Sequence, residues 1–405
     1  MKEMKFTDWY DRWNNSYSIW NAGNYTAAVE IRTQIMNEIY QDNSALDINY
    51  FPPFLSQEFG GPIGHNGLLG MHIAGQKLGL INSGKRFISV DSRNLSRPFF
   101  EQIKEEITFI SANNSSGNEN PDYWHVTERL QLIRAFGQFI DIYPLIENIF
   151  EKNRNSQKPI MNLLPVYEEN ARLQLKKLGL NDKDWFVTIH VRDTGLVGEV
   201  REQSIKTYFK AIDYILGIGG KVIRIGDPSM ARMDEKPGVI DLTRNFEVNS
   251  YLHLFALAKA KFFIGTNSGP KMLPPLYGVP SLITNLTAIG LESLKLVEGS
   301  IYVPKLIQKK GILLNFSEIM NSHIGYDNFN AKDLYKRDIL LINNSENEIF
   351  EAVREMANIV INKSNDREII LDEKIEKTRS GVLFSTKGNF STSWLKKNES
   401  WFLNY

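Results

Sequence analysis

The chain has 405 residues, no cysteine, and 47 Lys and Arg balanced by 47 Asp and Glu. Its length allows two or three domains, and the lack of cysteine excludes disulfides, thiolate metal sites and cysteine nucleophiles. Zero net charge removes the excess of positive charge that draws proteins to nucleic acid, so we expect no nucleic-acid partner, although a local basic cleft can still bind a small phosphorylated ligand.

Composition and the first residues indicate a cytosolic protein. Apolar residues make up 42% and charged residues 23% of the chain, as in soluble globular proteins. The opening MKEMKFTDWYDRW carries acids and Trp where a signal peptide needs an apolar stretch, and no apolar run approaches the ~18 residues of a transmembrane helix. We therefore expect a cytoplasmic location, with at most peripheral contact at the inner face of a membrane.

Residues 8–41 predict two short helices joined near NAGN. The pattern of Gly23, Tyr25 and Ala28 resembles half of a tetratricopeptide hairpin, but a single copy has no neighbour to stack on. We expect residues 1–45 to form a helical hairpin that packs as an appendage.

Residues 46–180 predict a Rossmann-like domain. Two apolar strand candidates, LDINYF (46–51) and KRFISVD (85–91), flank GGPIGHNGLLGMHIAGQKLGL (60–80), a glycine-rich turn that leads into a helix. Residues 111–122 have the composition of a loop, and residues 123–180 are mostly helical.

From residue 185 onward, strands and helices alternate regularly. The expected strands are WFVTIHV (185–191), KVIRIGD (221–227), KFFIGTN (261–267) and PSLITN (280–285). The expected helices are SIKTYFKAIDYILGIG (204–219), SYLHLFALAKA (250–260) and the short SGPKMLPPLYG (268–278). Apolar residues on both faces of the strands indicate parallel βαβ units.

The predicted fold class is therefore α/β, with two Rossmann-like domains facing a cleft. The second domain spans residues 181–345. Residues 346–405 are expected to form a C-terminal helix and a tail that packs back toward the N-terminal domain.

Polar residues stand at the carboxyl ends of three of the expected strands. They are His190-Val191-Arg192-Asp193, Arg224-Ile225-Gly226-Asp227 and Gly265-Thr266-Asn267-Ser268-Gly269. Ligands of open parallel sheets bind beyond the carboxyl ends of the strands, and alternation places His190 and Arg192 on one face. Arg forks onto phosphate oxygens, and the corner at Ser268 and Gly269 combines a helix cap with free N–H groups that favour an anion. Together they predict a diphosphate cradle.

Each of these elements also has a purely structural interpretation. A strand-end Arg can form an ion pair, Ser-Gly often begins a helix, His190 can be a core histidine, and Asp227 can cap the next turn. Their coincidence at consecutive strand ends favours the ligand site. The sequence contains neither a GxxxxGK[ST] P-loop nor a DxD pair where a Mg²⁺-dependent transferase would want one, so we expect no metal and no cofactor.

The combination of HVRDTG, GGKVIRIGD, IDLT, FFIGTNSGP and GVPSLITN resembles a family of bacterial glycosyltransferases. It is more distantly similar to the O-fucosyltransferase-like group, whose HxR motif ends a strand. The upstream GGPIGHNGLLG and the terminal FSTSWLKKNESWFL also resemble that bacterial family, so the similarity spans roughly residues 50–405.

The resemblance implies a GT-B fold, in which the C-terminal domain holds a nucleotide-sugar donor, the N-terminal domain faces the acceptor, and transfer needs no metal. By matched position, Arg192 binds the donor diphosphate and stabilises the leaving nucleotide. Ser268 and Gly269 hold phosphate, and His190 shapes the same pocket. Further donor-binding candidates are Arg201, Arg224 and Asn267.

Inverting transfer also needs a base near the acceptor hydroxyl, and two candidates stay open. Asp193 lies close to the donor site but can instead orient Arg192. His65, in the glycine-rich turn, can face the cleft but can instead bind only its own loop.

The leading hypothesis is a glycosyltransferase of bacterial surface glycan assembly, such as lipopolysaccharide or capsule, acting on a nucleotide sugar and a glycan or glycolipid acceptor. One alternative is an epimerase or hydrolase of the nucleotide sugar, with Asp193 and Glu199 as a carboxylate pair. The other is a non-catalytic carbohydrate-binding scaffold, suggested by seven Trp and sixteen Tyr. The sequence does not name the donor base, the sugar, the acceptor, the linkage or the oligomeric state.

Overall fold

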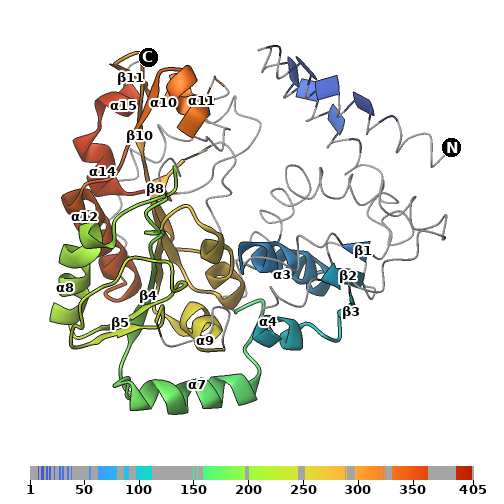
Figure 1. The fold of residues 1–405 in the computed structure, drawn as a ribbon, viewed down its shortest axis with the longest axis vertical. Coiled ribbons are helices and arrows are strands. Elements are labelled where there is room, and N and C mark those ends of the chain that lie inside the picture. Colours follow the sequence, from blue (N-terminus) through green and yellow to red (C-terminus); the bar gives the residue numbers. More distant parts are fainter. Residues whose placement is uncertain are drawn as a thin grey trace. The chain divides into compact units, whose positions relative to one another are not determined.

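The computed structural model (Figure 1) describes ten stretches of the chain, together with isolated positions between and before them. These stretches are residues 54–55, 63–79, 86–90, 97–111, 158–196, 200–244, 251–287, 297–320, 331–363 and 389–403. The chain divides into two compact units. Unit 1 comprises residues 1–95 and 103–152, and unit 2 comprises residues 96–102 and 153–405.

Unit 1 contains a three-stranded parallel sheet in the order β1-β2-β3. The strands are β1 (Phe54–Leu55), β2 (Arg86–Val90) and β3 (Ile107–Ser111), and helix α3 (Ile63–Lys77) connects the first two. The strand predicted at 85–91 and the helix predicted from the glycine-rich turn are confirmed. The strand predicted at 46–51 lies outside the described residues. In the first forty residues, Arg12 forms an ion pair with Glu38 at 2.8 Å, which joins the two segments expected to be helical.

Unit 2 is built on a seven-stranded sheet in which all strands are parallel, in the order β13-β9-β8-β7-β4-β5-β6. The strands are β4 (Phe186–His190), β5 (Lys221–Arg224), β6 (Val239–Asp241), β7 (Phe263–Gly265), β8 (Ser281–Leu286), β9 (Ile301–Pro304) and β13 (Asn389–Phe390). Every residue of β4, β7, β8 and β9 is buried, as expected where helices cover both faces of a parallel sheet. The predicted α/β class is confirmed.

Helices cover this sheet on both sides (Figure 1). Helices α8 (Phe209–Gly217) and α12 (Glu346–Val360) contact each other on one side. On the other side α9 (Tyr251–Lys259) contacts α7 (Pro165–Lys177), α4 (Arg97–Gln102) and the 3₁₀ turn η7 (Pro274–Tyr277). A capping box at Ser345 and Glu348 fixes the start of α12, because each residue bonds the other's backbone N–H.

Residues 389–403 of the C-terminal tail pack on unit 2, and the packing toward the N-terminal domain expected from the sequence stays a prediction. Strand β13 extends the large sheet beside β9, and α14 (Thr392–Lys397) contacts α12. Glu355 of α12 accepts hydrogen bonds from Ser391 Oγ (2.7 Å) and Thr392 N (3.0 Å), which anchors the first turn of α14.

An aromatic cluster packs beside the contact between α14 and α12. The ring of Trp401, in α15 (Ser400–Leu403), lies 4.9 Å from Trp394 and 5.2 Å from Phe316, measured between ring centroids. Both tryptophans are buried, so these aromatic residues form core and not the exposed sugar platform that the scaffold hypothesis needs.

A second, smaller sheet in unit 2 was not predicted. It is antiparallel, in the order β11-β10-β12, with β10 (Leu306–Lys309), β11 (Ile312–Leu313) and β12 (Ile339–Ile342). The short helices α10 (Phe316–Met320) and α11 (Ala331–Lys336) lie between β11 and β12 in the chain. Within the part of the chain that the structure describes, no helix has the length and apolarity to cross a bilayer.

Candidate active site at the β4–β7 switch point

The strand order places two of the predicted polar segments side by side. From β4 the chain proceeds to β5 and β6 on one side, and then returns to β7 on the opposite side of β4. His190 at the end of β4 is in register with Gly265 at the end of β7. The chain leaves β4 toward β5 and leaves β7 toward β8, so the loops after these two strands run in opposite directions. Parallel α/β sheets bind ligands in the crevice between two such loops. The segments 190–193 and 265–269 therefore meet at this switch point.

Two buried polar atoms at the switch point have no hydrogen-bond partner among the described residues. They are Nδ1 of His190 and Oγ1 of Thr266, both in side chains that are almost fully buried. The backbone joins the two residues, because Thr266 N donates to His190 O at 3.3 Å. Buried polar groups without a partner are rare in native proteins and indicate a bound water, ion or ligand.

His190 is a neutral group at this site. Burial lowers the pKa of its imidazole to about 4; the negative charge of Asp227 opposes this shift, and the positive charges of Arg192 and Arg224 add to it. Near pH 7 the side chain therefore acts through hydrogen bonds and not through charge.

The guanidinium of Arg192 is held by Glu202. The Arg192 Nε to Glu202 Oε1 distance is 3.3 Å, and the Arg192 side chain keeps 26% of its surface exposed. Glu202 also accepts hydrogen bonds from Thr194 N (2.6 Å), Thr194 Oγ1 (2.7 Å) and Gly195 N (3.1 Å). One carboxylate thus bonds the backbone of the loop after β4 and forms an ion pair with the guanidinium of Arg192. Glu202 was not among the predicted site residues, although its charge lies within the same polar stretch of sequence.

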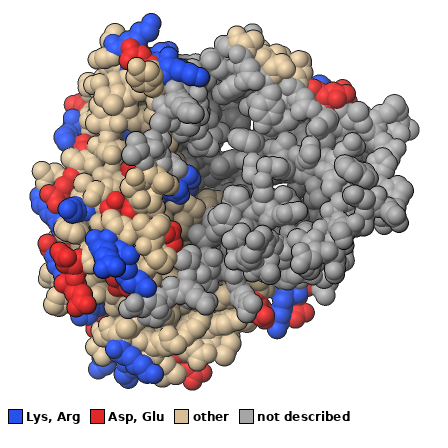
Figure 2. All heavy atoms as spheres, viewed as in Figure 1, with Lys and Arg blue, Asp and Glu red and all other residues tan. Residues whose placement is uncertain are grey.

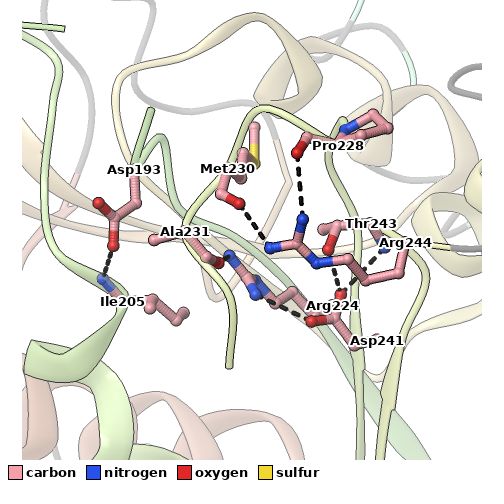
Figure 3. Close-up of polar contacts among 9 residues, drawn as sticks. All are labelled: Asp193, Ile205, Arg224, Pro228, Met230, Ala231, Asp241, Thr243 and Arg244. Atoms are coloured by element: carbon pink, nitrogen blue, oxygen red, sulfur yellow. Dashed lines mark hydrogen bonds and ion pairs between the residues drawn. The ribbon is translucent and has the colours of Figure 1, made fainter. Parts of the chain in front are cut away.

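Asp193 is tied to the backbone of the fold (Figure 3). Its Oδ2 accepts a hydrogen bond from Ile205 N at 2.8 Å, at the first residue of the 3₁₀ turn η5 (Ile205–Tyr208). Its carbonyl oxygen accepts from Ala231 N at 2.6 Å. These contacts favour a positioning role for Asp193; its role as a general base stays a prediction.

Two arginines support the loop that reaches Asp193. Arg224, whose side chain is 0% exposed, donates to Asp241 Oδ2 at 2.9 Å and to Ala231 O at 2.7 Å. Arg244 donates to Met230 O at 2.7 Å and to Pro228 O at 3.1 Å. Figure 3 shows both guanidinium groups turned toward the backbone of residues 228–231. Arg224 thus forms an ion pair inside the fold, as the structural interpretation of a strand-end Arg expects. Binding of Arg224 to a donor stays a prediction.

The segment after β7 differs in one respect from the expected helix start. It forms two 3₁₀ turns, η6 (Gly269–Met272) and η7, because Pro270, Pro274 and Pro275 lack the N–H groups that a regular α-helix needs. Ser268 adopts an extended N-cap conformation, but its side chain makes no capping hydrogen bond. The short helix and the helix cap expected at this corner are therefore absent, while the buried Ser268 and the half-buried Gly269 remain at the switch point.

Lys271 is a basic residue of this corner that sequence reasoning missed. Its Nζ donates to Asn267 Oδ1, and Asn267 Nδ2 donates to Thr287 Oγ1 at 3.2 Å. Asn267 is thereby fixed between β7 and β8, and it holds an ammonium group next to Ser268. A Lys at the second position after Gly269 in GTNSGPK was the available signal.

The remaining predicted residues have less definite positions. Arg201 is half-buried in the turn that precedes η5. His65 lies within α3, but its side chain is outside the described residues, as is Glu199. Among the described residues, no group of three or more His, Asp or Glu side chains has a metal-binding arrangement.

Comparison with known proteins gives structural similarity only. No protein-family model matches the chain, and no curated protein matches it. A glycosyl transferase family 9 protein from Veillonella parvula is 15% identical with a TM-score of 0.36, covering 57% of this chain and 79% of its own. ADP-heptose lipopolysaccharide heptosyltransferase II from E. coli is 8% identical with a TM-score of 0.46, covering 76% and 98%. The iron-containing dodecameric glycosyltransferase TibC from enterotoxigenic E. coli is 15% identical with a TM-score of 0.40, covering 76% and 75%. Similarities at this level assign neither a family nor an activity.

Proposed function

We propose that the chain is a glycosyltransferase of GT-B type, which moves a sugar from a nucleotide-sugar donor to an acceptor in bacterial surface glycan assembly. The observation that supports it is the pairing of β4 with β7, which brings the HxR segment and the 266–269 corner to one switch point. The proposal extends the resemblance of HVRDTG and FFIGTNSGP to bacterial glycosyltransferases, and more distantly to the O-fucosyltransferase-like group.

The groups at the switch point suit a diphosphate. Arg192 supplies a guanidinium on a partly exposed side chain, with its Nε in an ion pair with Glu202. His190 Nδ1 and Thr266 Oγ1 supply two buried polar atoms that could form hydrogen bonds with an oxygen or hydroxyl group of the ligand. Preorganised donors of this kind stabilise negative charge that develops in a transition state more effectively than water does.

In the proposed reaction the bond between the sugar C1 and the diphosphate oxygen breaks, and the acceptor oxygen forms the new bond to C1. The electron pair of the broken bond stays on the diphosphate, where Arg192 offsets the added negative charge. The acceptor proton passes to a base, and inversion at C1 follows from attack opposite the leaving group. Asp193 and His65 are the two candidate bases. Asp193 would have to use its Oδ1, because Oδ2 already accepts from Ile205 N.

Ligand-induced thermal shifts test the donor site. We expect UDP-, GDP- or ADP-linked sugars to raise the unfolding temperature, and a monophosphate-linked CMP-sugar to raise it less, because the site grips two phosphates. Arg192→Ala should weaken nucleotide affinity about 10- to 100-fold, since hydrogen bonds to charged groups contribute about 1.5–3 kcal/mol. Arg192→Lys should recover only part of it, because Lys cannot fork onto phosphate.

Arg354→Ala is the matched control, because Arg354 lies in unit 2 but forms only an exposed ion pair with Glu351. If no nucleotide shifts the wild-type protein, or if Arg192→Ala shifts as much as Arg354→Ala, the donor site is wrongly placed. With the responding donor, release of nucleotide in the absence of any acceptor at the same rate as in its presence would instead favour a hydrolase.

A further inference from the structure

The small antiparallel sheet carries an outward face that is mostly apolar. The register pairs Gln308 of β10 with Leu313 of β11 and with Leu340 of β12, so these three side chains point to one side. Leu306 and Ile342, two residues away, share that side. Leu340 is 57% and Leu313 40% exposed, whereas Ile307 and Ile339 on the opposite side are buried. A solvent-facing sheet side normally carries polar residues, so this side departs from the rule.

Two turns meet at one end of this sheet and carry positive charge. Lys310 N donates to Asp338 O at 2.9 Å, which places the β10–β11 turn directly beside the segment that enters β12. The two turns contribute Lys309, Lys310 and Lys336 against the single acid Asp338. Figure 2 shows Lys and Arg side chains gathered at the end of unit 2 where Figure 1 labels β11.

Large apolar side chains project from the same two turns. Ile312, in register with Lys309 and therefore on the side of the sheet opposite to Leu313, is 69% exposed at this end of the sheet, and Tyr335, directly before Lys336, is 90% exposed. Exposed apolar groups bordered by basic ones are typical of surfaces that lie on a membrane. Tyr is also a residue enriched at the interface between lipid and water.

We infer that the end of the small sheet at which the two turns meet, with Lys310, Ile312, Leu313, Tyr335, Lys336 and Leu340 and called here the hairpin surface, docks on an anionic phospholipid bilayer. The apolar side chains enter the interface between headgroups and acyl chains, and the lysines contact lipid phosphates. A second copy of the chain is a poorer partner, because a two-fold contact would bring each basic turn against basic residues of its own kind. The inference does not depend on the proposed transferase activity.

Vesicle sedimentation tests the hairpin surface. The full-length protein should sediment with phosphatidylcholine vesicles that contain phosphatidylglycerol and not with phosphatidylcholine alone, and high salt should release it. Lys310→Gln combined with Lys336→Gln should lower the partition coefficient about 25-fold, because each Lys near an anionic surface contributes about fivefold. Ile312→Ser combined with Tyr335→Ser should lower it about tenfold or more through lost apolar burial.

The matched control is Leu173→Ser combined with Lys177→Gln, both exposed on α7 and outside the hairpin surface. It should bind vesicles as the wild type does, and thermal unfolding should show that all three variants are folded. The inference is overturned if the protein sediments with neither kind of vesicle, or if it binds equally well with and without phosphatidylglycerol. It is also overturned if the control variant loses as much binding as the hairpin-surface variants. Mass photometry gives a further outcome: a dimer abolished by the Ile312 and Tyr335 changes would make a second copy the partner instead.

Discussion

Removing the negative charge beside Arg224 should strongly destabilise unit 2. Arg224 is fully buried, and its counter-charge is Asp241 at 2.9 Å. Asp241→Asn retains the size of the side chain and an oxygen that can accept from Thr243 N and Oγ1, as Asp241 does at 3.0 and 2.7 Å. It leaves the guanidinium facing an amide without charge. An uncompensated buried charge of this kind costs about 3–5 kcal/mol of unfolding free energy.

The measurement should report on β5 and β6 themselves, because a chain with two units need not unfold in one step. Hydrogen exchange across a urea gradient, read by mass spectrometry from peptides that cover these strands, gives a local unfolding midpoint. Glu351→Gln is the control: it breaks the exposed Arg354 ion pair and should cost no more than about 1 kcal/mol. Replacing the buried pair together, as Arg224→Met with Asp241→Leu, should cost less than Asp241→Asn alone. If Asp241→Asn and Glu351→Gln shift the midpoint equally, Arg224 is not the buried charge described above.

Two further predictions concern stability. Burial lowers the pKa of both His190 and His253 from 6.5 to about 4, so between these values the unfolded chain binds more protons than the folded chain. The unfolding free energy therefore has its full value above pH 6.5 and decreases as the pH falls toward 4. At pH 5 the loss is about 2 kcal/mol for each histidine. Because His253 contributes equally, His190→Gln should remove about half of the histidine contribution to the pH dependence of the unfolding free energy between pH 6.5 and 5, and an unchanged slope would show that His190 is not buried as a neutral group. Ser345→Ala should destabilise α12 by about 1 kcal/mol because it removes the capping box, whereas Ser345→Asp retains an acceptor and should cost less; equal losses in thermal unfolding would contradict the capping role.

Most strands and helices of unit 2 were predictable because their signals are local. The apolar runs at 185–191, 221–227 and 261–267 correspond to β4, β5 and β7, and the helix expected within residues 346–405 corresponds to α12. Each run is bounded by Gly, Pro or polar residues that end a strand or begin a helix. The polar residues that follow β4, β5 and β7 were identified for the same reason.

Other elements carry weaker local signals. Strand β6 has three residues and β11 and β13 have two, too few for a periodic pattern. The small antiparallel sheet was missed because its pairing joins residues 306–309 with residues 339–342, across a long separation in sequence. The corner after β7 became two 3₁₀ turns because three prolines remove donors that a helix requires.

By itself the sequence determined which side chains stand at the ends of the strands, since burial and chain direction follow from local pattern. Only the tertiary structure decided which strand ends are neighbours: β4 pairs with both β5 and β7, which places the segment that carries Arg192 beside the segment that carries the 266–269 corner, while Arg224 pairs with Asp241. Arg192 and Arg224 both lie near the carboxyl end of a strand, two residues after β4 and at the last residue of β5, but the surroundings of the two guanidinium groups differ. Glu202 holds Arg192 where part of its side chain is exposed, whereas Asp241 and a backbone carbonyl enclose Arg224 completely.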